Sequence, residues 1–184
     1  TSVVRFTQSL QRGIRSVASG MSPPQFTLLE VMTNRWLPDA LACITRLGVA
    51  DLLWDGPMPV NQLASKAQVN EKNLYRVLRA LSRRRLLIES PVGTFSLTDV
   101  TRSLCSQSPA SFRNMVLEIA RERNSLVWSH MHDSVREGTA IWDRFFDTDM
   151  WTHLDAHPEE HHIFHQAMVE LTREAAPAFA RAFD

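Results

Sequence analysis

The sequence predicts a mainly α-helical fold with a winged-helix-like module and one small β-hairpin. First, apolar residues recur at the helical spacing through most of the 184 residues. Second, residues 59–99 follow the order helix, turn, helix, hairpin, which is that of a winged helix. Third, none of the six glycines lies close to another, so the chain contains no glycine-rich phosphate loop or dinucleotide-binding turn.

The composition is that of a globular protein, with 44% hydrophobic and 22% charged residues. Lys and Arg together balance Asp and Glu, 20 against 20, so no global charge favours nucleic acid or an anionic membrane. No apolar run is long enough to span a membrane, and no signal peptide is visible. With Cys43 and Cys105 expected as free buried thiols, we expect a cytoplasmic protein. A start at Thr1 and no helix stop before Asp184 suggest a piece of something longer.

Residues 1–22 are expected to form an arm helix, because apolar side chains recur at helical spacing over 3–18. A second apolar series covers 25–47, within which Pro38 should start or kink a helix. Gly48 suits the position just after a helix, and one further short turn follows it.

The winged-helix module begins with a short helix over 60–67. Asn70 is a good N-cap for the next helix, whose buried stripe consists of Leu74, Val77, Leu78 and Leu81. Residues 86–89 and 94–97 are predicted to be the two strands of the hairpin, joined by Ser90-Pro91-Val92-Gly93.

The second half is predicted to be helical, with a broken aromatic segment at 139–157. Pro109 should open one long helix that stops at Gly138, with a kink allowed by its length. Pro158 should start the last helix, which carries Ile163, Phe164, Ala167, Met168 and Leu171 on one side.

A basic cluster offers one functional hypothesis. Residues 61–103 contain eight basic and three acidic side chains, a local charge of +5. A winged helix with a basic second helix can bind duplex DNA, so a transcription regulator is the alternative function. The same arginines equally suit a solvated helix face that ends at the negative end of the helix dipole.

The remaining polar constellations do not indicate catalysis. All seven histidines lie in the second half, and His161 and His165 share a helix face, but no Cys is nearby and a metal site is not expected. No nucleophile is framed by a base, and Glu159 and Glu160 suit the first turn of a helix. The aromatic and Met residues of 128–168 suit either a core or contact with a planar apolar ligand.

The order of these predicted helices and strands, and the residues in them, resemble the N-terminal half of small-molecule O-methyltransferases from plants and bacteria. The matching stretches are LPDALACITRLGVADLLWDGPMPVNQLASKAQVNEKNLYRVLRALSRRRLLIE, GTFSLTDVTRSL, WSHMHDSVREG and DMWTHLDAHPEEHHIFHQAMVEL, together spanning 37–171. The resemblance implies a homodimer in which 23–105 form the dimerisation core and 106–184 cap the substrate. It further implies that S-adenosylmethionine binds a C-terminal Rossmann-like domain that is absent here, so no catalytic or cofactor-binding residue is expected in this chain.

The resemblance also implies an acceptor pocket for an aromatic secondary metabolite that is methylated on a hydroxyl. Its expected lining is Trp151, Phe164 and Met168, with Phe146, Trp128 and Met131 as further candidates. Under this interpretation the winged helix dimerises and binds no nucleic acid. A family member that serves only as an interaction partner is a third hypothesis. Arg85 departs from the family, which often has Gly there, so the local turn is in question.

Overall fold

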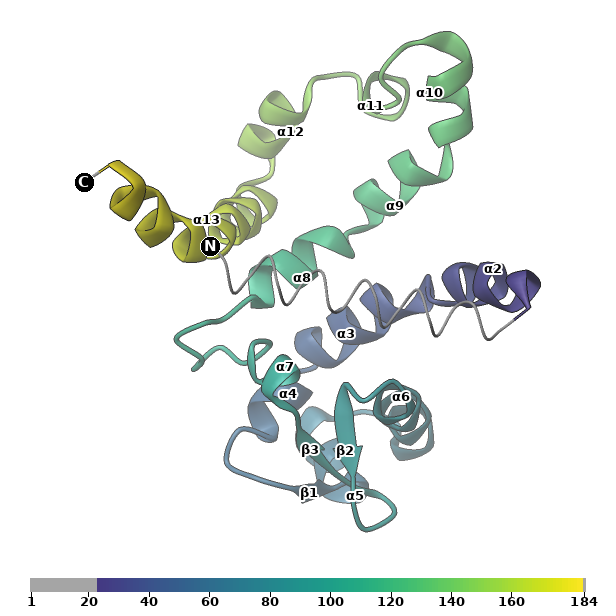
Figure 1. The fold of residues 1–184 in the computed structure, drawn as a ribbon, viewed down its shortest axis with the longest axis vertical. Coiled ribbons are helices and arrows are strands. Elements are labelled where there is room, and N and C mark those ends of the chain that lie inside the picture. The colour runs from purple at the N-terminus through teal and green to yellow at the C-terminus, as the bar shows by residue number, and fades with distance from the viewer. Residues whose placement is uncertain (1–22, 184) are drawn as a thin grey trace. The chain divides into compact units, whose positions relative to one another are not determined.

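A computed structural model describes residues 23–183, which form helices and one small antiparallel sheet (Figure 1). The predicted arm helix of residues 1–22 lies outside the described residues. The chain divides into two compact units, 1–37 and 38–184.

The described part of the first unit is dominated by α2 (Pro24–Thr33), which begins with proline at a position where no backbone hydrogen bond is lost. None of its residues is buried. Its exposed large apolar side chains are Phe26, Leu28, Leu29, Val31 and Met32.

The apolar series predicted over 25–47 is divided between α2 and α3 (Trp36–Arg46). Pro38 lies in the first turn of α3, where backbone N–H groups have no partner within the helix. The prediction that Pro38 marks a helix start is therefore confirmed. Gly48 has a φ of 68° and connects α3 to the short α4 (Val49–Leu52), a left-handed conformation that favours glycine.

Two helices and a hairpin then follow as predicted. They are α5 (Val60–Ala67) and α6 (Glu71–Arg83), and the Asn70 side chain accepts a 3.0 Å hydrogen bond from the Asn73 N–H at the start of α6. The stripe of α6 predicted to be apolar is buried at Leu74, Leu78 and Leu81.

The sheet contains one strand more than the sequence predicted. β2 (Leu87–Glu89) pairs antiparallel with β3 (Thr94–Leu97), with Leu87 opposite Leu97. β1 (Met58–Pro59) pairs with the other edge of β3, which gives the order β1-β3-β2. A strand of two residues carries no alternation of apolar and polar residues, so the sequence pattern could not show it.

Arg85 adopts a left-handed conformation, with a φ of 57°, in the turn between α6 and β2. An L-residue with a Cβ atom is disfavoured in this region, and glycine is not. The sequence left the geometry of this turn in question, because relatives often have glycine where this chain has Arg85. In the structure, Arg85 itself adopts the left-handed conformation that glycine takes most easily.

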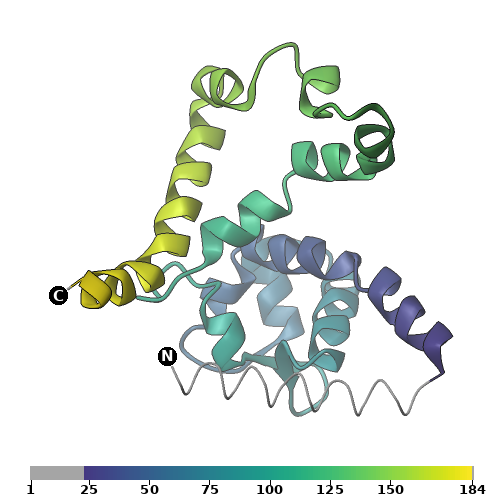
Figure 2. The same ribbon diagram turned by 45° about the horizontal axis from the view of Figure 1, so that its top comes forward.

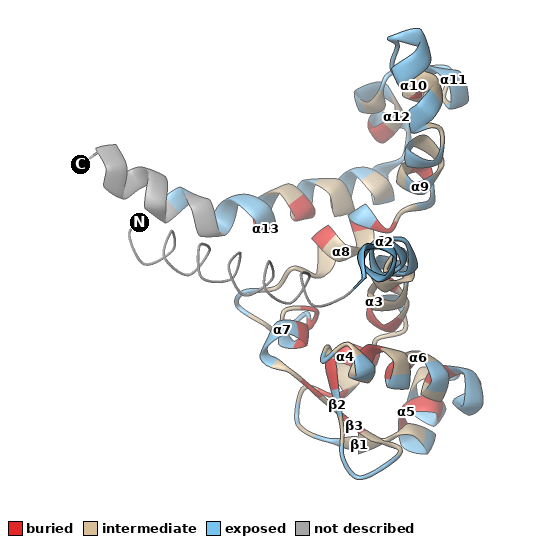
Figure 3. Ribbon diagram, turned by 45° about the vertical axis from the view of Figure 1, so that its right-hand side comes forward, coloured by how far each residue is buried: buried red, intermediate tan, exposed pale blue. Residues whose placement is uncertain are grey.

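The core of the second unit gathers around this sheet and the helices packed on it (Figure 3). Its largest fully buried side chains include Phe95, Ile44 and Leu78. The short α7 (Asp99–Arg102) opens with a capping box between Thr98 and Thr101. The buried Thr101 hydroxyl also donates to the Leu86 carbonyl at 2.8 Å, which ties α7 to the start of β2.

The long helix predicted from Pro109 to Gly138 is wrong, because the structure has three helices there and the first begins at Arg113 rather than at Pro109. They are α8 (Arg113–Ile119), α9 (Glu122–Ser129) and α10 (Met131–Glu137). The first break lies at Arg121, whose ψ of 143° is extended. The Asn124 amide donates to the Glu118 carbonyl at 2.6 Å and so satisfies one oxygen at the end of α8.

The remaining helices are α11 (Trp142–Phe145), α12 (Met150–Ala156) and α13 (Pro158–Phe183). α13 starts at Pro158 as predicted and packs along α8 (Figure 2). The buried Glu170 carboxylate of α13 accepts hydrogen bonds from the Asn114 and Met115 N–H groups at 3.1 and 2.9 Å. It therefore caps the first turn of α8 from a neighbouring helix.

Candidate functional site

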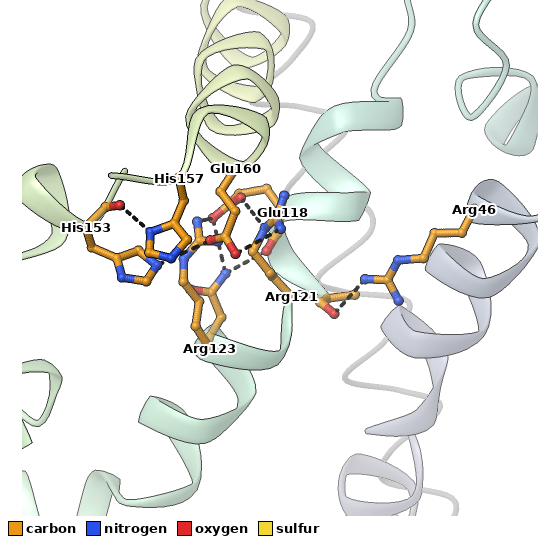
Figure 4. Close-up of polar contacts among 9 residues, drawn as sticks. Arg46, Glu118, Arg121, Arg123, His153, His157 and Glu160 are labelled. Carbon is orange, nitrogen blue, oxygen red and sulfur yellow. Dashed lines mark hydrogen bonds and ion pairs between the residues drawn. The ribbon is translucent and has the colours of Figure 1, made fainter. Parts of the chain in front are cut away.

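A network of ion pairs joins the α8–α9 junction to the first turn of α13 (Figure 4). Arg123 is 6% exposed, and its guanidinium donates to both Glu118 and Glu160. Arg121 contacts the same two carboxylates, with Nε 3.2 Å from Glu118 Oε2 and Nη1 3.5 Å from Glu160 Oε1. The two arginines and two glutamates balance in charge, which is the condition under which such groups are found buried.

Two stacked histidines extend this network towards α12. His153 Nε2 lies 3.5 Å from Glu160 Oε2, within ion-pair distance but without hydrogen-bond geometry. The His157 ring stacks on the His153 ring with centroids 4.1 Å apart, and His157 Nδ1–H donates to the His153 carbonyl at 2.7 Å. That hydrogen bond holds the turn between α12 and α13 in place.

Two aromatic rings pack edge-on against His153. Trp142 and Phe146 stack with centroids 4.3 Å apart, and their centroids lie 5.4 and 5.1 Å from that of His153. The Trp142 Nε1–H donates to the Thr148 carbonyl at 2.7 Å. The broken segment between α10 and α12 is thus ordered by stacking around one histidine.

The network, His153 and Phe146 border a pocket of about 690 Å³ within the second unit. This volume is in the range of small-molecule sites. The pocket is lined by Asp39, Arg46, Ala120, Arg121, Glu122, Arg123, Ser125, Leu126, Phe146, His153 and Glu160. The Arg46 guanidinium of α3 reaches it by donating to the Ala120 carbonyl at 3.1 Å.

Two nitrogen atoms of this pocket's residues have no hydrogen-bond partner. They are Arg123 Nε and His153 Nε2, the two buried side-chain polar atoms left without a partner in the part of the chain that the structure describes. Buried polar atoms in folded proteins are almost always satisfied, so these two nitrogens are exceptions within an otherwise paired network.

The structure brings some of the predicted acceptor residues together. Trp151 of α12 meets Phe164 of α13 edge to face, with centroids 5.7 Å apart. Met168 follows Phe164 by one helical turn, and Glu160 precedes it by one, so α13 presents the polar network and the predicted aromatic contacts along adjoining turns.

The other candidates are more scattered. Phe146 lines the pocket described above. Trp128 on α9 and Met131 on α10 are 68% and 50% exposed. Trp151 is itself 61% exposed, so most of its ring is free to contact another group.

The sequence did not single out Arg46, Glu118, Arg121 or Arg123 as site residues, and it assigned Glu160 only to the helix dipole. The sequence did contain one signal, a charged residue among the apolar residues of one helix. Glu118 lies between Val116 and Ile119 in a helix that packs on α13, and a buried charge at such a position requires a partner.

Both cysteines are free thiols, but only Cys105 is buried as expected, whereas Cys43 is half-buried. Burial, and after it the charge of Asp51, raises the pKa of the Cys105 thiol to about 11. Its Sγ donates to the Ala50 carbonyl at 3.3 Å. Cys105 is therefore a packed, unreactive thiol.

In the described part of the chain, no group of three or more His, Cys, Asp or Glu side chains could hold a metal ion. Within the same residues, no helix has the length and apolar content needed to cross a membrane.

The basic side chains of α6 are exposed. Lys72, Arg76, Arg79 and Arg83 follow one another at spacings of four, three and four residues, so they form one stripe of the helix. Arg79 lies over the Tyr75 ring, with its Cζ 5.8 Å from the centroid. This agrees with a solvated helix face, the simpler of the two interpretations of the basic cluster.

Residues 29–107 match the O-methyltransferase dimerisation domain family. The chain is 30% identical to phenazine O-methyltransferase PhzM of Lysobacter antibioticus, over 90% of this chain and 48% of that protein. It is also 30% identical to the O-demethylpuromycin-O-methyltransferase of Streptomyces alboniger, over 78% of this chain and 38% of the relative.

The solved structures agree. The crystal structure of LaPhzM superposes with a TM-score of 0.84 at 29% identity, covering 89% of this chain and 49% of that one. RosA of Streptomyces davawensis is an N,N-8-amino-8-demethyl-D-riboflavin dimethyltransferase. Its structure superposes with a TM-score of 0.76 at 26% identity, covering 87% of this chain and 48% of that one. The chain thus spans about half the length of the relatives it matches. It contains an O-methyltransferase dimerisation domain and corresponds to the N-terminal part of small-molecule O-methyltransferases.

Proposed function

We propose that this chain is the dimerisation and acceptor-binding part of an S-adenosylmethionine-dependent O-methyltransferase that methylates a hydroxyl of an aromatic secondary metabolite. The observation that carries the proposal is the agreement over nearly the whole chain with LaPhzM, at a TM-score of 0.84. The catalytic contribution of such a part is to hold the acceptor in position and exclude water, since proximity supplies much of the rate of methyl transfer.

The acceptor would contact Trp151, Phe164 and Met168, with Phe146, Trp128 and Met131 as further contacts. The edge-to-face pair of Trp151 and Phe164 supports this assignment, because exposed aromatic faces next to a flexible Met suit a planar apolar ligand.

The chain would act as a homodimer, with α2 covered by the second copy. Five large apolar side chains of this ten-residue helix are more than half exposed, a density unusual for a surface that faces only water. Part of α2 lies within the matched dimerisation domain of 29–107.

The S-adenosylmethionine would be bound outside these 184 residues. The glycines of this chain are dispersed, and a nucleotide-binding turn needs them clustered so that the backbone approaches the ligand closely. We therefore assign no residue here to the cofactor. The free thiols suit a reducing, cytoplasmic compartment.

Sedimentation equilibrium tests the dimer. We expect twice the chain mass, and a shift to the monomer in the Val31→Glu variant, which places a charge on the exposed face of α2. Val92→Glu is the matched control, because Val92 is 86% exposed in the hairpin turn. A monomeric wild-type chain, or an unchanged Val31→Glu dimer, would refute the assigned dimer face.

Methyl transfer from labelled S-adenosylmethionine to hydroxylated aromatic compounds, assayed on the complete natural protein, tests the activity. Trp151→Ala should raise the KM for the acceptor with little change in the affinity for S-adenosylmethionine. Loss of cofactor affinity alone, with an unchanged acceptor KM, would contradict the role given to Trp151.

A further inference from the structure

The exposed basic stripe of α6 has no counter-charge in the described part of the chain. Lys72, Arg76, Arg79 and Arg83 form this stripe, and none of them takes part in an ion pair within residues 23–183. Like charges three and four residues apart on a helix repel one another, so the stripe lowers the stability of the helix that carries it. An anionic partner would remove that cost.

A second part of the chain has the opposite charge. Residues 133–160, the acidic segment, contain eight acidic and two basic side chains, a charge of −6. Asp143 on α11, Asp147 between α11 and α12, and Glu159 on α13 are exposed, and none of the three lies in an ion pair within the described residues. A chain with no net charge therefore concentrates positive charge in one segment and negative charge in another.

We propose that, in the homodimer, the basic stripe of α6 of each copy binds the acidic segment of the other copy. The inference rests on the proposed homodimer and adds a contact surface to that of α2. In a two-fold dimer each contact occurs twice, so both stripes and both acidic segments are neutralised together. Complementary charges fix the orientation of two partners and speed their association, while apolar surface such as that of α2 supplies most of the affinity.

Duplex DNA is the other polyanion that a basic helix can bind, but α6 is poorly suited to it. When the second helix of a helix-turn-helix enters the major groove, its N-terminal residues approach the bases. Glu71 is exposed in the first turn of α6 and would be repelled by the phosphates. The hairpin turn at residues 90–93 carries no basic side chain that could bind a phosphate. The charges thus favour a protein partner, and the acidic segment of a second copy has the required sign.

Two charge-reversal variants of the 184-residue chain test the proposal. The stripe variant carries Arg76→Glu and Arg79→Glu, and the segment variant carries Asp143→Lys and Asp147→Lys. All four native side chains are exposed and none lies in an ion pair in the described part of the chain, so we expect both variants to fold. In the stripe variant the new carboxylates lie one turn from Lys72 and Arg83, which favours the helix.

Each variant alone should form a weaker homodimer than the wild type, because like charges then meet at both symmetric contacts. The dissociation constant, measured by fluorescence-detected sedimentation over a dilution series, should rise about tenfold, since four exposed charges of the dimer change sign. The control variant, Lys66→Glu with Arg102→Glu, changes the net charge as the stripe variant does, but on α5 and α7. Its dissociation constant should stay within about twofold of the wild type, because salt screens charges that lie outside the contact.

Mixing the two variants should restore the dimer. In a heterodimer the reversed stripe meets the reversed segment and the native stripe meets the native segment, so attraction returns at both contacts. If each homodimer is weakened about tenfold, heterodimers should make up about nine-tenths of all dimers after joint refolding, against about half for random pairing. Native mass spectrometry measures this fraction.

The outcomes separate this inference from the function on which it rests. Random pairing of the two variants refutes the inference and leaves the proposed homodimer intact, whereas a monomeric wild-type chain overturns both. Association beyond two copies refutes the reciprocal contact, because non-reciprocal contacts build open chains. Random pairing together with DNA binding that the stripe variant loses assigns the stripe to nucleic acid instead. If the segment variant does not fold, as circular dichroism would show, a stripe-variant dimer with the wild-type dissociation constant still refutes the inference.

Discussion

Replacing Arg123 by methionine tests whether the ion-pair network holds the second half of the chain in place. Methionine fills a similar volume but removes the charge, so Glu118 and Glu160 lose the partner they share. Glu118 is only 7% exposed, and an uncompensated carboxylate at that depth is costly. Breaking a buried ion pair on one side destabilises a protein by about 3–5 kcal/mol.

Arg121 reduces this cost but does not remove it. It remains 3.2 Å from Glu118 and 3.5 Å from Glu160, so each carboxylate keeps one cation. We therefore expect the low end of the range, about 3 kcal/mol, or a fall in melting temperature of roughly 6–12 °C for a chain of this size. Differential scanning calorimetry at one fixed protein concentration measures it, because dimerisation would make the transition depend on concentration.

Arg144→Met is the matched control. Arg144 pairs with Glu137 and Asp133, but its side chain is 41% exposed, and exposed pairs contribute little. Its melting temperature should stay close to that of the wild type. Equal falls in melting temperature for Arg123→Met and Arg144→Met would refute the reasoning, because the buried ion pairs would then contribute no more to stability than the exposed ones. A strong loss in Arg123→Met that disappears in high salt would also contradict it, since buried pairs are screened weakly.

Three further predictions concern single residues. Arg85→Gly should stabilise the chain by about 1 kcal/mol in urea unfolding, because glycine adopts the left-handed conformation of that turn without the Cβ penalty. Cys105 should resist iodoacetamide at pH 8 until the chain is unfolded, since its pKa of about 11 leaves little thiolate; rapid alkylation in the native chain would contradict this. Hydrogen bonds from Thr152 and Trp151 lower the pKa of Asp149, the N-cap of α12, so its stabilising effect is complete above the unfolded pKa and is lost as pH falls through the lower folded value. Asp149→Asn should therefore flatten the acid limb of the stability curve, and an unchanged limb would count against the cap.

The fold could be predicted from sequence wherever local signals agreed with packing. Asn70 capped its helix because a side-chain acceptor at that position satisfies an otherwise unpaired N–H. The start of α13 at Pro158 followed from the fixed φ of proline. The interruption of α8 at Arg121 could not be predicted in this way, because residues 121–125 contain no Gly or Pro and apolar residues resume at Leu126. Arg121 takes an extended ψ there and contacts Glu118 and Glu160, the latter far along the chain.

In the candidate site, too, some residues could be predicted from the sequence and others could not. Aromatic positions could be proposed from sequence, and Trp151 and Phe164 do meet, because residues on two consecutive helices with a tight turn between them are neighbours in space. The pairing of Arg123 with Glu118 and Glu160 depended on which faces of α9 and α13 turn towards each other. Helical periodicity gives the position of a residue on its own helix but not the partner across the gap.

The placement of the ion pairs follows from how little apolar surface the α9–α12 segment buries. Between Glu122 and His157, the buried residues are Arg123, Ile141 and Leu154, whereas the winged-helix region buries a continuous core. A segment with so few apolar contacts gains little from the hydrophobic effect and opens locally at low cost. Charged groups anchor it at its two ends, at Arg123 and at Glu160, and leave its middle without a core of its own. An aromatic acceptor held against Trp151 would add apolar contacts to this segment, so acceptor binding and ordering of the segment should be linked.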